Sequence, residues 1–261
     1  MKNLIRMALA EDIGPGDITT ELFVPKGQKA KAFIIAKEAG IIAGLPIAMM
    51  VYGVLDPKVK FIFKIKDASK VKKGKIIAEI SGSARSILTG ERLALNFLQR
   101  LSGIATLTDK FVARVKGTRA KILDTRKTTP LWRGAEKYAV LAGGGVNHRM
   151  GLFDAILIKD NHLKYCKDIR LSGNFEMEAA NMPQVKKAIK AGASRILLDN
   201  MSVKTLRSAV KLCKPAGVKT EASGGIRLDN VRAVAKTGVD FISIGALTHS
   251  ARALDLSLKI I

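Results

Sequence analysis

The sequence predicts an α/β protein in which a TIM-like (β/α) barrel domain follows an N-terminal α+β, sandwich-like domain. After Lys121, short apolar runs alternate with helical patterns, which is typical of successive βα units on a parallel sheet. Earlier in the chain, short β-like runs are separated by glycines, which indicates an antiparallel sheet. We therefore divide the chain into residues 1–105 and residues 106–250, and residues 251–261 form a segment that can pack on the first domain.

The N-terminal domain is expected to open with a short amphipathic helix, because Ile5, Ala8 and Leu9 recur at helical spacing. Gly14 and Gly16 then interrupt the helical pattern. The predicted strands are residues 32–36, 40–44, 60–65 and 76–80, with a helix over residues 46–55.

A longer helix is predicted over residues 87–101. Its apolar positions share one face, and Arg92, Asn96 and Gln99 share the opposite, polar face. The apolar positions are Ala94, Phe97, Leu98 and Leu101. A surface arginine is in most cases only a solvated charge, so the pattern by itself does not make Arg92 a ligand residue.

The second domain is expected to contain six strands, and six or seven βα units in succession favour a barrel. The predicted strands are residues 122–123, 155–158, 175–179, 196–198, 218–222 and 241–244. The predicted helices between them include residues 182–191, 203–212 and 229–237.

Polar side chains follow these strands one after another. They are Asp124, Arg126, Lys127, Lys159, Asp160, Glu178, Asp199, Asn200, Glu221 and Ser223, and the three histidines His148, His162 and His249 also follow strands. Polar groups at the carboxyl ends of successive barrel strands converge on one mouth. A stable core does not need this arrangement, so it indicates a binding site.

Five potentially cationic side chains cluster where strands end and loops begin: Arg126, Lys127, His148, Arg149 and Lys159. Arginine offers two parallel donors to a carboxylate or phosphate, and lysine offers a point charge. The cluster therefore predicts a multiply anionic small molecule as the ligand.

Two loops near the end of the chain predict a phosphate site. Ser223, Gly224 and Gly225 end one strand before a helix, and the segment from Gly245 to Ser250 ends the next. Exposed backbone N–H groups at a helix start bind phosphate, and the last βα loops of a barrel are its usual place.

The formal net charge of the 261-residue chain is +23, which admits nucleic acid as a partner. The excess is spread over both halves, and the densest cluster, Lys70 to Lys75, has no aromatic side chains to stack on bases. Lysine-rich solvated faces explain the charge better. We therefore expect no nucleic-acid partner.

The sequence contains no run of 18 apolar residues, no signal-peptide pattern and only two isolated cysteines, Cys166 and Cys213. These features predict a reduced, cytoplasmic protein without a membrane partner.

Four linked motifs occur in one order: DTRKTTP at residues 124–130, EKYAV at 136–140, GGGVNHR at 143–149 and KDNH at 159–162. Together they resemble the quinolinate phosphoribosyltransferase family, also called nicotinate-nucleotide pyrophosphorylase (carboxylating). The resemblance extends over nearly the whole chain. It implies an incomplete barrel and the transfer of phosphoribosyl from phosphoribosyl pyrophosphate to quinolinate, with decarboxylation to nicotinate mononucleotide in NAD biosynthesis.

The resemblance also implies roles for individual residues. Arg126, Arg149 and Lys159 would hold the pyridine dicarboxylate, with Arg92 and His148 beside them. The catalytic residues would be Lys127 at the pyrophosphate, and Glu178 and Asp199 at the ribose hydroxyls and a Mg²⁺ ion. Further substrate contacts would come from Thr125, Ser223, Gly224, Gly225, Gly245, Ala246 and His249. Arg92 would reach the neighbouring subunit's site, which makes the working unit at least a homodimer.

The chain departs from the family pattern twice. Leu131 stands where the family usually has glycine after Pro130, and only 13 residues separate Asp160 from Asn174, so that crossover must be short.

Three other interpretations remain open at this point. A related phosphoribosyltransferase could use another acceptor, because ring preference depends on pocket shape. A Schiff-base aldolase could use Lys159, whose pKa nearby arginines would lower. A nucleic-acid binder would show salt-sensitive binding without catalysis.

Overall fold

The computed structural model describes residues 1–165 and 173–261, which divide into two compact units. Unit 1 comprises residues 1–107, 130–143 and 251–261, and unit 2 comprises residues 108–129 and 144–250. The predicted boundary at residue 105 is close to the first division. Residues 130–143, which the prediction included in the second domain, belong to unit 1.

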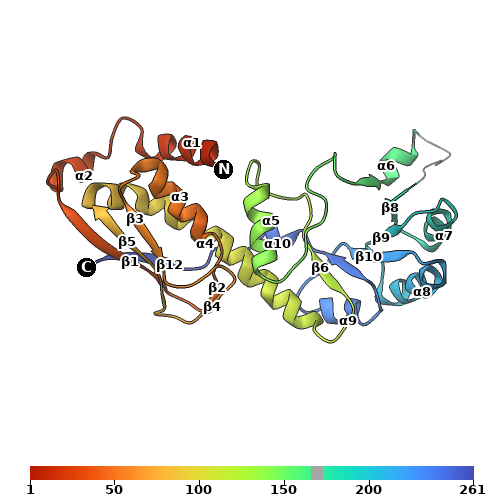
Figure 1. Cartoon of the computed structure of the whole chain (residues 1–261). Helices are drawn as coiled ribbons and strands as arrows, with labels where there is room; N and C mark the ends of the chain where they lie inside the picture. The colour runs from red at the N-terminus through yellow and green to blue at the C-terminus, as the bar shows by residue number, and fades with distance from the viewer. Residues whose placement is uncertain (166–172) are drawn as a thin grey trace. The chain divides into compact units, whose positions relative to one another are not determined.

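Unit 1 is built on an antiparallel sheet (Figure 1). Its strands, in spatial order, are β12 (Leu256–Ile260), β1 (Lys29–Ala36), β5 (Ile76–Ser83) and β3 (Lys60–Phe63). The last strand of the chain pairs with β1, so that Ala32 lies opposite Ile260 and Ala36 opposite Leu256. A separate short ladder joins β2 (Gly40–Ile41) to β4 (Lys70–Val71), so the predicted strand over residues 40–44 is shorter than expected.

Five helices belong wholly or partly to unit 1: α1 (Lys2–Ile13), α2 (Ile18–Phe23), α3 (Leu45–Leu55), α4 (Ala84–Val115) and α5 (Arg133–Ala142). Asp17 caps α2 by accepting a hydrogen bond of 3.0 Å from the backbone N–H of Thr20. At 32 residues, α4 is longer than the predicted 87–101 segment, because Ile104, Phe111 and Val115 continue its buried stripe.

The segment 130–143 belongs to unit 1 through contacts with residues distant in sequence. The Trp132 ring stacks on Phe97, Glu136 accepts hydrogen bonds from Arg100, and the Tyr138 hydroxyl donates to Asp67 at 2.6 Å. The spacing of apolar and polar residues along the segment does not predict contacts with residues so distant in sequence.

Unit 2 contains six parallel strands. In spatial order they are β6 (Lys121–Leu123), β11 (Phe241–Ser243), β10 (Lys219–Ser223), β9 (Arg195–Asp199), β8 (Phe175–Ala179) and β7 (Ile156–Ile158). In the described part of the chain β6 and β7 form the two edges of this sheet, so the barrel is not closed. The predicted incomplete barrel is confirmed.

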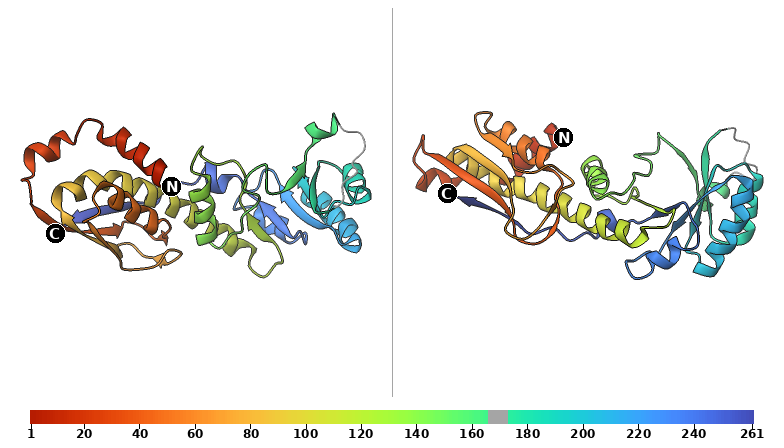
Figure 2. Two further views of the ribbon diagram at one scale, coloured as in Figure 1. Left: turned by 45° about the horizontal axis from the view of Figure 1, so that its top comes forward. Right: turned by 60° about the horizontal axis from the view of Figure 1, so that its bottom comes forward.

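Helices α7 (Met182–Lys190) and α8 (Val203–Cys213) cover one face of this sheet (Figures 1 and 2). The shorter helices of unit 2 are α6 (Asp160–Leu163), α9 (Val231–Ala235) and α10 (Ala246–His249). The crossover between Asp160 and Asn174 begins with α6, and its residues 166–172 lie outside the described residues. None of the described helices has the length and apolar character that crossing a bilayer requires.

Candidate functional site

A cavity of about 460 Å³ lies at the carboxyl ends of the unit 2 strands. It gathers thirteen of the residues singled out from the sequence: Thr125, Arg126, Lys127, His148, Arg149, Lys159, Glu178, Asp199, Asn200, Glu221, Ser223, Gly224 and Gly225. The lining comes from unit 2 alone. Arg92 is exposed on α4 in unit 1 and is not part of this lining.

The alternation of side chains along each strand explains this convergence. In β8, Met177 is fully buried while its neighbour Glu178 faces the cavity. In β9, Ile196 and Leu198 are fully buried, whereas Leu197 and Asp199 line the cavity. The residue that ends each strand on the inner face therefore reaches the mouth.

Two arginines define the cationic side of the cavity. The Nε atom of Arg126 is buried and has no hydrogen-bond partner. Burial and the nearby charge of Arg126 lower the pKa of the Arg149 guanidinium. Two guanidinium groups that repel each other, one with an unsatisfied buried donor, form a site suited to an anion.

Carboxylates define the opposite side. The Nζ atom of Lys159 lies 3.7 Å from Glu178 Oε2. Burial raises the pKa of the Glu178 carboxyl, and the charges of Asp199 and Asp160 act in the same direction against that of Lys159. Asn200 donates a hydrogen bond of 2.8 Å to Asp199 Oδ2. This group of oxygens has the chemistry that hard cations and sugar hydroxyls prefer.

The first glycine loop has a left-handed backbone conformation that favours glycine. Gly224 has a φ angle of +90°, and a Cβ atom there would lie 2.1 Å from Asn200 Oδ1. Gly225 follows with a φ of +61°. The absence of side chains lets the backbone approach a ligand closely.

The second glycine loop lies beside Lys127. A Cβ atom on Gly245 would lie 3.0 Å from Lys127 Cδ and 3.1 Å from His249 Nε2. The Thr248 hydroxyl donates to the backbone oxygen of Lys127 at 2.7 Å. Gly245, Ala246 and His249 do not line the cavity. The hydrogen bond from Thr248 nevertheless joins α10 to the loop that carries Lys127.

His148 is anchored at several atoms. Its backbone N–H donates to Asp124 Oδ1 at 2.8 Å, and its Nε2 lies 3.1 Å from Glu176 and 3.5 Å from Glu221. Burial alone would lower the pKa of His148, but the hydrogen bond to Glu176 and the charge of Glu221 outweigh it and the pKa is raised. In turn, burial and the charge of Glu176 raise the pKa of Glu221 to about 7.

Glu176, which supports His148, was not among the predicted site residues. Leu157, Leu197 and Ser243 line the cavity and were not predicted either. A signal was present in the period of two: Glu176, Leu157 and Leu197 each precede by two residues a strand-end residue that was named.

Comparisons with known proteins agree in pointing to one family. Residues 17–102 match the family described as quinolinate phosphoribosyl transferase, N-terminal domain, and residues 104–259 match the corresponding C-terminal domain. The chain is 46% identical to the probable nicotinate-nucleotide pyrophosphorylase [carboxylating] of Bacillus subtilis, over 100% of this chain and 93% of that protein.

A plant relative and a solved structure also match this chain over its full length. The chain is 42% identical to the chloroplastic nicotinate-nucleotide pyrophosphorylase [carboxylating] of Arabidopsis thaliana, over 100% of this chain and 82% of that protein. The nicotinate-nucleotide pyrophosphorylase structure from Francisella tularensis superimposes with a TM-score of 0.95 at 42% identity. The superposition covers 100% of this chain and 95% of that one.

Proposed function

Because this chain belongs to the quinolinate phosphoribosyltransferase family, it is a decarboxylating pentosyltransferase, and we propose that the cavity of unit 2 is its active site. The enzyme transfers phosphoribosyl from phosphoribosyl pyrophosphate to quinolinate and forms nicotinate mononucleotide, pyrophosphate and CO₂ in NAD biosynthesis. The observation that carries the assignment of the site is the Arg126–Arg149 pair, which includes a buried donor without a partner.

The acceptor end of the cavity is the cationic side. Quinolinate carries two carboxylates on adjacent ring carbons, and Arg126, Arg149 and Lys159 supply more positive charge than one carboxylate can neutralise. His148 lies beside them, and Leu157 and Leu197 offer apolar contact for the ring. Binding would relieve the repulsion between the two guanidinium groups.

The donor end consists of Lys127, Thr125 and the first glycine loop, and the second glycine loop lies beside Lys127. Lys127 would face the pyrophosphate, and Thr125 already orders this loop by accepting a hydrogen bond from the Lys127 N–H at 3.0 Å. The 5-phosphate would bind at the two loops, whose residues are Ser223, Gly224, Gly225, Gly245, Ala246 and His249. Phosphate at such loops is held by backbone N–H groups.

The chemistry needs no general base. The ring nitrogen of quinolinate attacks C1 of the ribose while pyrophosphate leaves, and CO₂ is lost once that nitrogen is cationic and accepts the electron pair. The protein would contribute by holding both substrates in line and by neutralising the leaving group through Lys127.

Glu178 and Asp199 are the residues proposed to hold Mg²⁺. The donor set fits, since both side chains offer carboxylate oxygens at neighbouring strand ends, and burial together with the charge of Asp199 raises the pKa of Glu178. Bound there with substrate oxygens, the cation would neutralise charge on the pyrophosphate. The same carboxylates would accept hydrogen bonds from the ribose hydroxyls.

Arg92 completes the proposal. Its exposed position on α4 in unit 1 supports a role in a neighbouring subunit's cavity, within a homodimer or a larger assembly.

A cytoplasmic location also belongs to the proposal, supported by the buried free thiol of Cys213.

The decisive assay measures pyrophosphate release from phosphoribosyl pyrophosphate with quinolinate, nicotinate or nicotinamide as acceptor. The enzyme should accept quinolinate as a substrate, and nicotinate should react at least tenfold more slowly. With nicotinate bound, a buried cation would face no carboxylate, which costs about 2–5 kcal/mol of binding free energy. Equal rates with quinolinate and nicotinate would contradict the assignment of Arg126 and Arg149 to the two carboxylates.

A further inference from the structure

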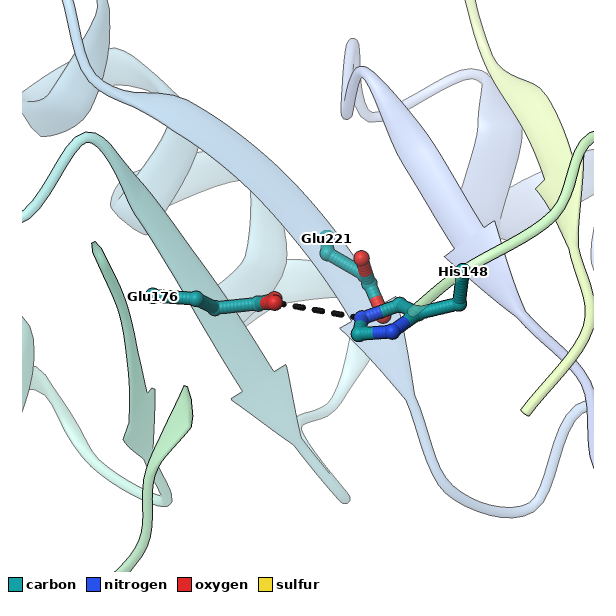
Figure 3. A group of neighbouring side chains, drawn as sticks. All are labelled: His148, Glu176 and Glu221. Atoms are coloured by element: carbon teal, nitrogen blue, oxygen red, sulfur yellow. Dashed lines mark hydrogen bonds and ion pairs between the residues drawn. The ribbon is translucent and has the colours of Figure 1, made fainter. Parts of the chain in front are cut away.

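The ring of His148 lies between two buried carboxylates that come from different strands. Glu176 on β8 and Glu221 on β10 both point toward its Nε2 atom, at 3.1 Å and 3.5 Å (Figure 3). These two strands are not adjacent, because β9 lies between them. The ring of His148 therefore links side chains from two strands that do not pair with each other.

The second ring nitrogen is also occupied. The backbone N–H of Arg149 donates to His148 Nδ1 at 2.8 Å. A ring nitrogen that accepts a hydrogen bond carries no proton, so the hydrogen-bond network places the proton on Nε2, which donates to Glu176. The surroundings thereby select one tautomer and one ring orientation.

Arg195 anchors this arrangement on β9. Its NH1 atom lies 3.1 Å from Glu221 Oε2, and its guanidinium stacks 4.2 Å from the ring centroid of Phe241. Glu221 is fixed at one oxygen and turns the other, Oε1, toward His148. Both Glu221 Oε1 and Glu176 Oε1 are buried without a hydrogen-bond partner, which proteins seldom tolerate for stability alone.

A metal site would be the other explanation of this cluster. One ligand atom from each of His148, Glu176 and Glu221 lies within 4.8 Å of the others. A metal on Nε2 would require the ring proton on Nδ1, where the Arg149 N–H already donates. The hydrogen bonds therefore oppose a metal at these three groups.

We propose that Glu221, with Glu176 and Arg195, is a positioning residue for the acceptor end of the cavity. The carboxylates fix the ring of His148, and Nδ1 of that ring fixes the backbone N–H of Arg149. In this way the cluster, in which His148 and Glu221 also line the cavity, aims the Arg149 guanidinium toward the site shared with Arg126. The inference rests on the proposed function of the cavity.

The first test observes His148 directly without substrate. The chain has three histidines, so nitrogen-15 NMR of the labelled protein resolves each ring, and the His148→Asn variant assigns the signals of His148. The wild type should show a protonated Nε2 and an unprotonated, hydrogen-bonded Nδ1. Glu221→Gln should shift both signals, because its amide presents a donor to Nε2–H or gives up the bond with Arg195.

Glu136→Gln is a matched control for this spectrum. Glu136 is also fully buried and bound to an arginine, with Arg100 NH2 at 2.9 Å, but it lies on α5 in unit 1. Its replacement should leave the His148 signals unchanged.

The second test separates positioning from general destabilisation. Glu221→Gln should raise the KM for quinolinate at least tenfold and leave the KM for phosphoribosyl pyrophosphate within twofold. A parallel rise of both KM values, or an unchanged His148 spectrum, would overturn the proposal. So would a protonated Nδ1 in the wild type, because that nitrogen could then not accept from the Arg149 N–H. Selective broadening of the His148 signals by added Mn²⁺ would instead make the cluster a metal site.

Failure of the two proposals can be told apart. If the wild type does not turn over quinolinate, the proposed function fails. The spectra of the wild type and Glu221→Gln still decide whether the carboxylates hold His148.

Discussion

The indole ring of Trp132 stacks on the phenyl ring of Phe97, with centroids 4.3 Å apart and planes 17° apart. The residue just before it, Leu131, has a φ angle of +66° and is 77% exposed. The stack lies in the segment 130–143 of unit 1 and helps to hold the backbone turn at Leu131. Glycine would favour the left-handed conformation of this turn, whereas leucine disfavours it.

Leu131→Gly is therefore expected to increase the free energy of unfolding by about 1 kcal/mol, since the left-handed conformation costs a non-glycine residue roughly that amount. Urea unfolding measures the difference. Leu131→Ala is the control, because it removes the exposed side chain but keeps the strained Cβ atom. An equal gain in both variants would show that backbone strain is not the cause.

Gly224→Ala should impair binding of the donor substrate. The new Cβ atom would lie 2.1 Å from Asn200 Oδ1 at a φ of +90°, so the phosphate loop must move. The KM for phosphoribosyl pyrophosphate is expected to rise at least tenfold, with a smaller effect on quinolinate. Gly217→Ala is the control for strain alone, because Gly217 has a φ of +68° and nothing within 4 Å. If both variants change KM equally, the loop has no special role.

Glu178→Gln and Asp199→Asn should each lower kcat at least tenfold and weaken the dependence of the rate on Mg²⁺, because each removes a charged oxygen ligand. Initial rates over a range of Mg²⁺ concentrations, before and after EDTA treatment, give the measurement. Asp160→Asn changes the same charge nearby and should keep the wild-type Mg²⁺ response. A wild-type response in Glu178→Gln or Asp199→Asn removes that residue from the metal site.

Glu221→Gln should become more stable relative to the wild type as pH rises. The pKa of Glu221 is raised to about 7 in the folded protein, above its ordinary value near 4.5. Between these values the unfolded chain releases the proton more readily, so the wild type loses stability as pH rises through this window. The gain should reach up to about 3 kcal/mol by pH 8. Urea unfolding of both proteins from pH 5 to pH 8 tests this, and a constant difference would contradict it.

Arg92→Ala and Lys159→Ala should each be nearly inactive, yet refolding the two variants together should restore activity. In a mixed dimer with a shared site, one site collects both lesions and the other none. Random pairing makes about half the dimers mixed, so roughly a quarter of all sites should be intact. Absence of recovery, with mixed dimers shown to form, would place Arg92 outside the neighbouring subunit's site.

Much of unit 2 was accessible from sequence because its signals are local. A period of two marks the strands, a period near 3.6 marks the helices, and parallel strands direct their carboxyl ends to one edge. For that reason Arg126, Lys127, Lys159, Glu178 and Asp199 could be assigned to one mouth before any contact was known. The boundaries were less accessible: α4 continues to Val115, and the strand that begins at Gly40 ends at Ile41.

The sequence by itself determined the order of elements, the α/β architecture and the chemical character of the site, since all of these depend on residue type and short-range periodicity. That the barrel is incomplete was implied by the family resemblance. Only the tertiary structure decided that residues 130–143 join unit 1 and that β12 pairs with β1. It also decided that Glu176 and Glu221 lie beside Nε2 of His148. These relationships join residues between 28 and more than 200 positions apart, and side chains at such separations meet only when the whole sheet has formed.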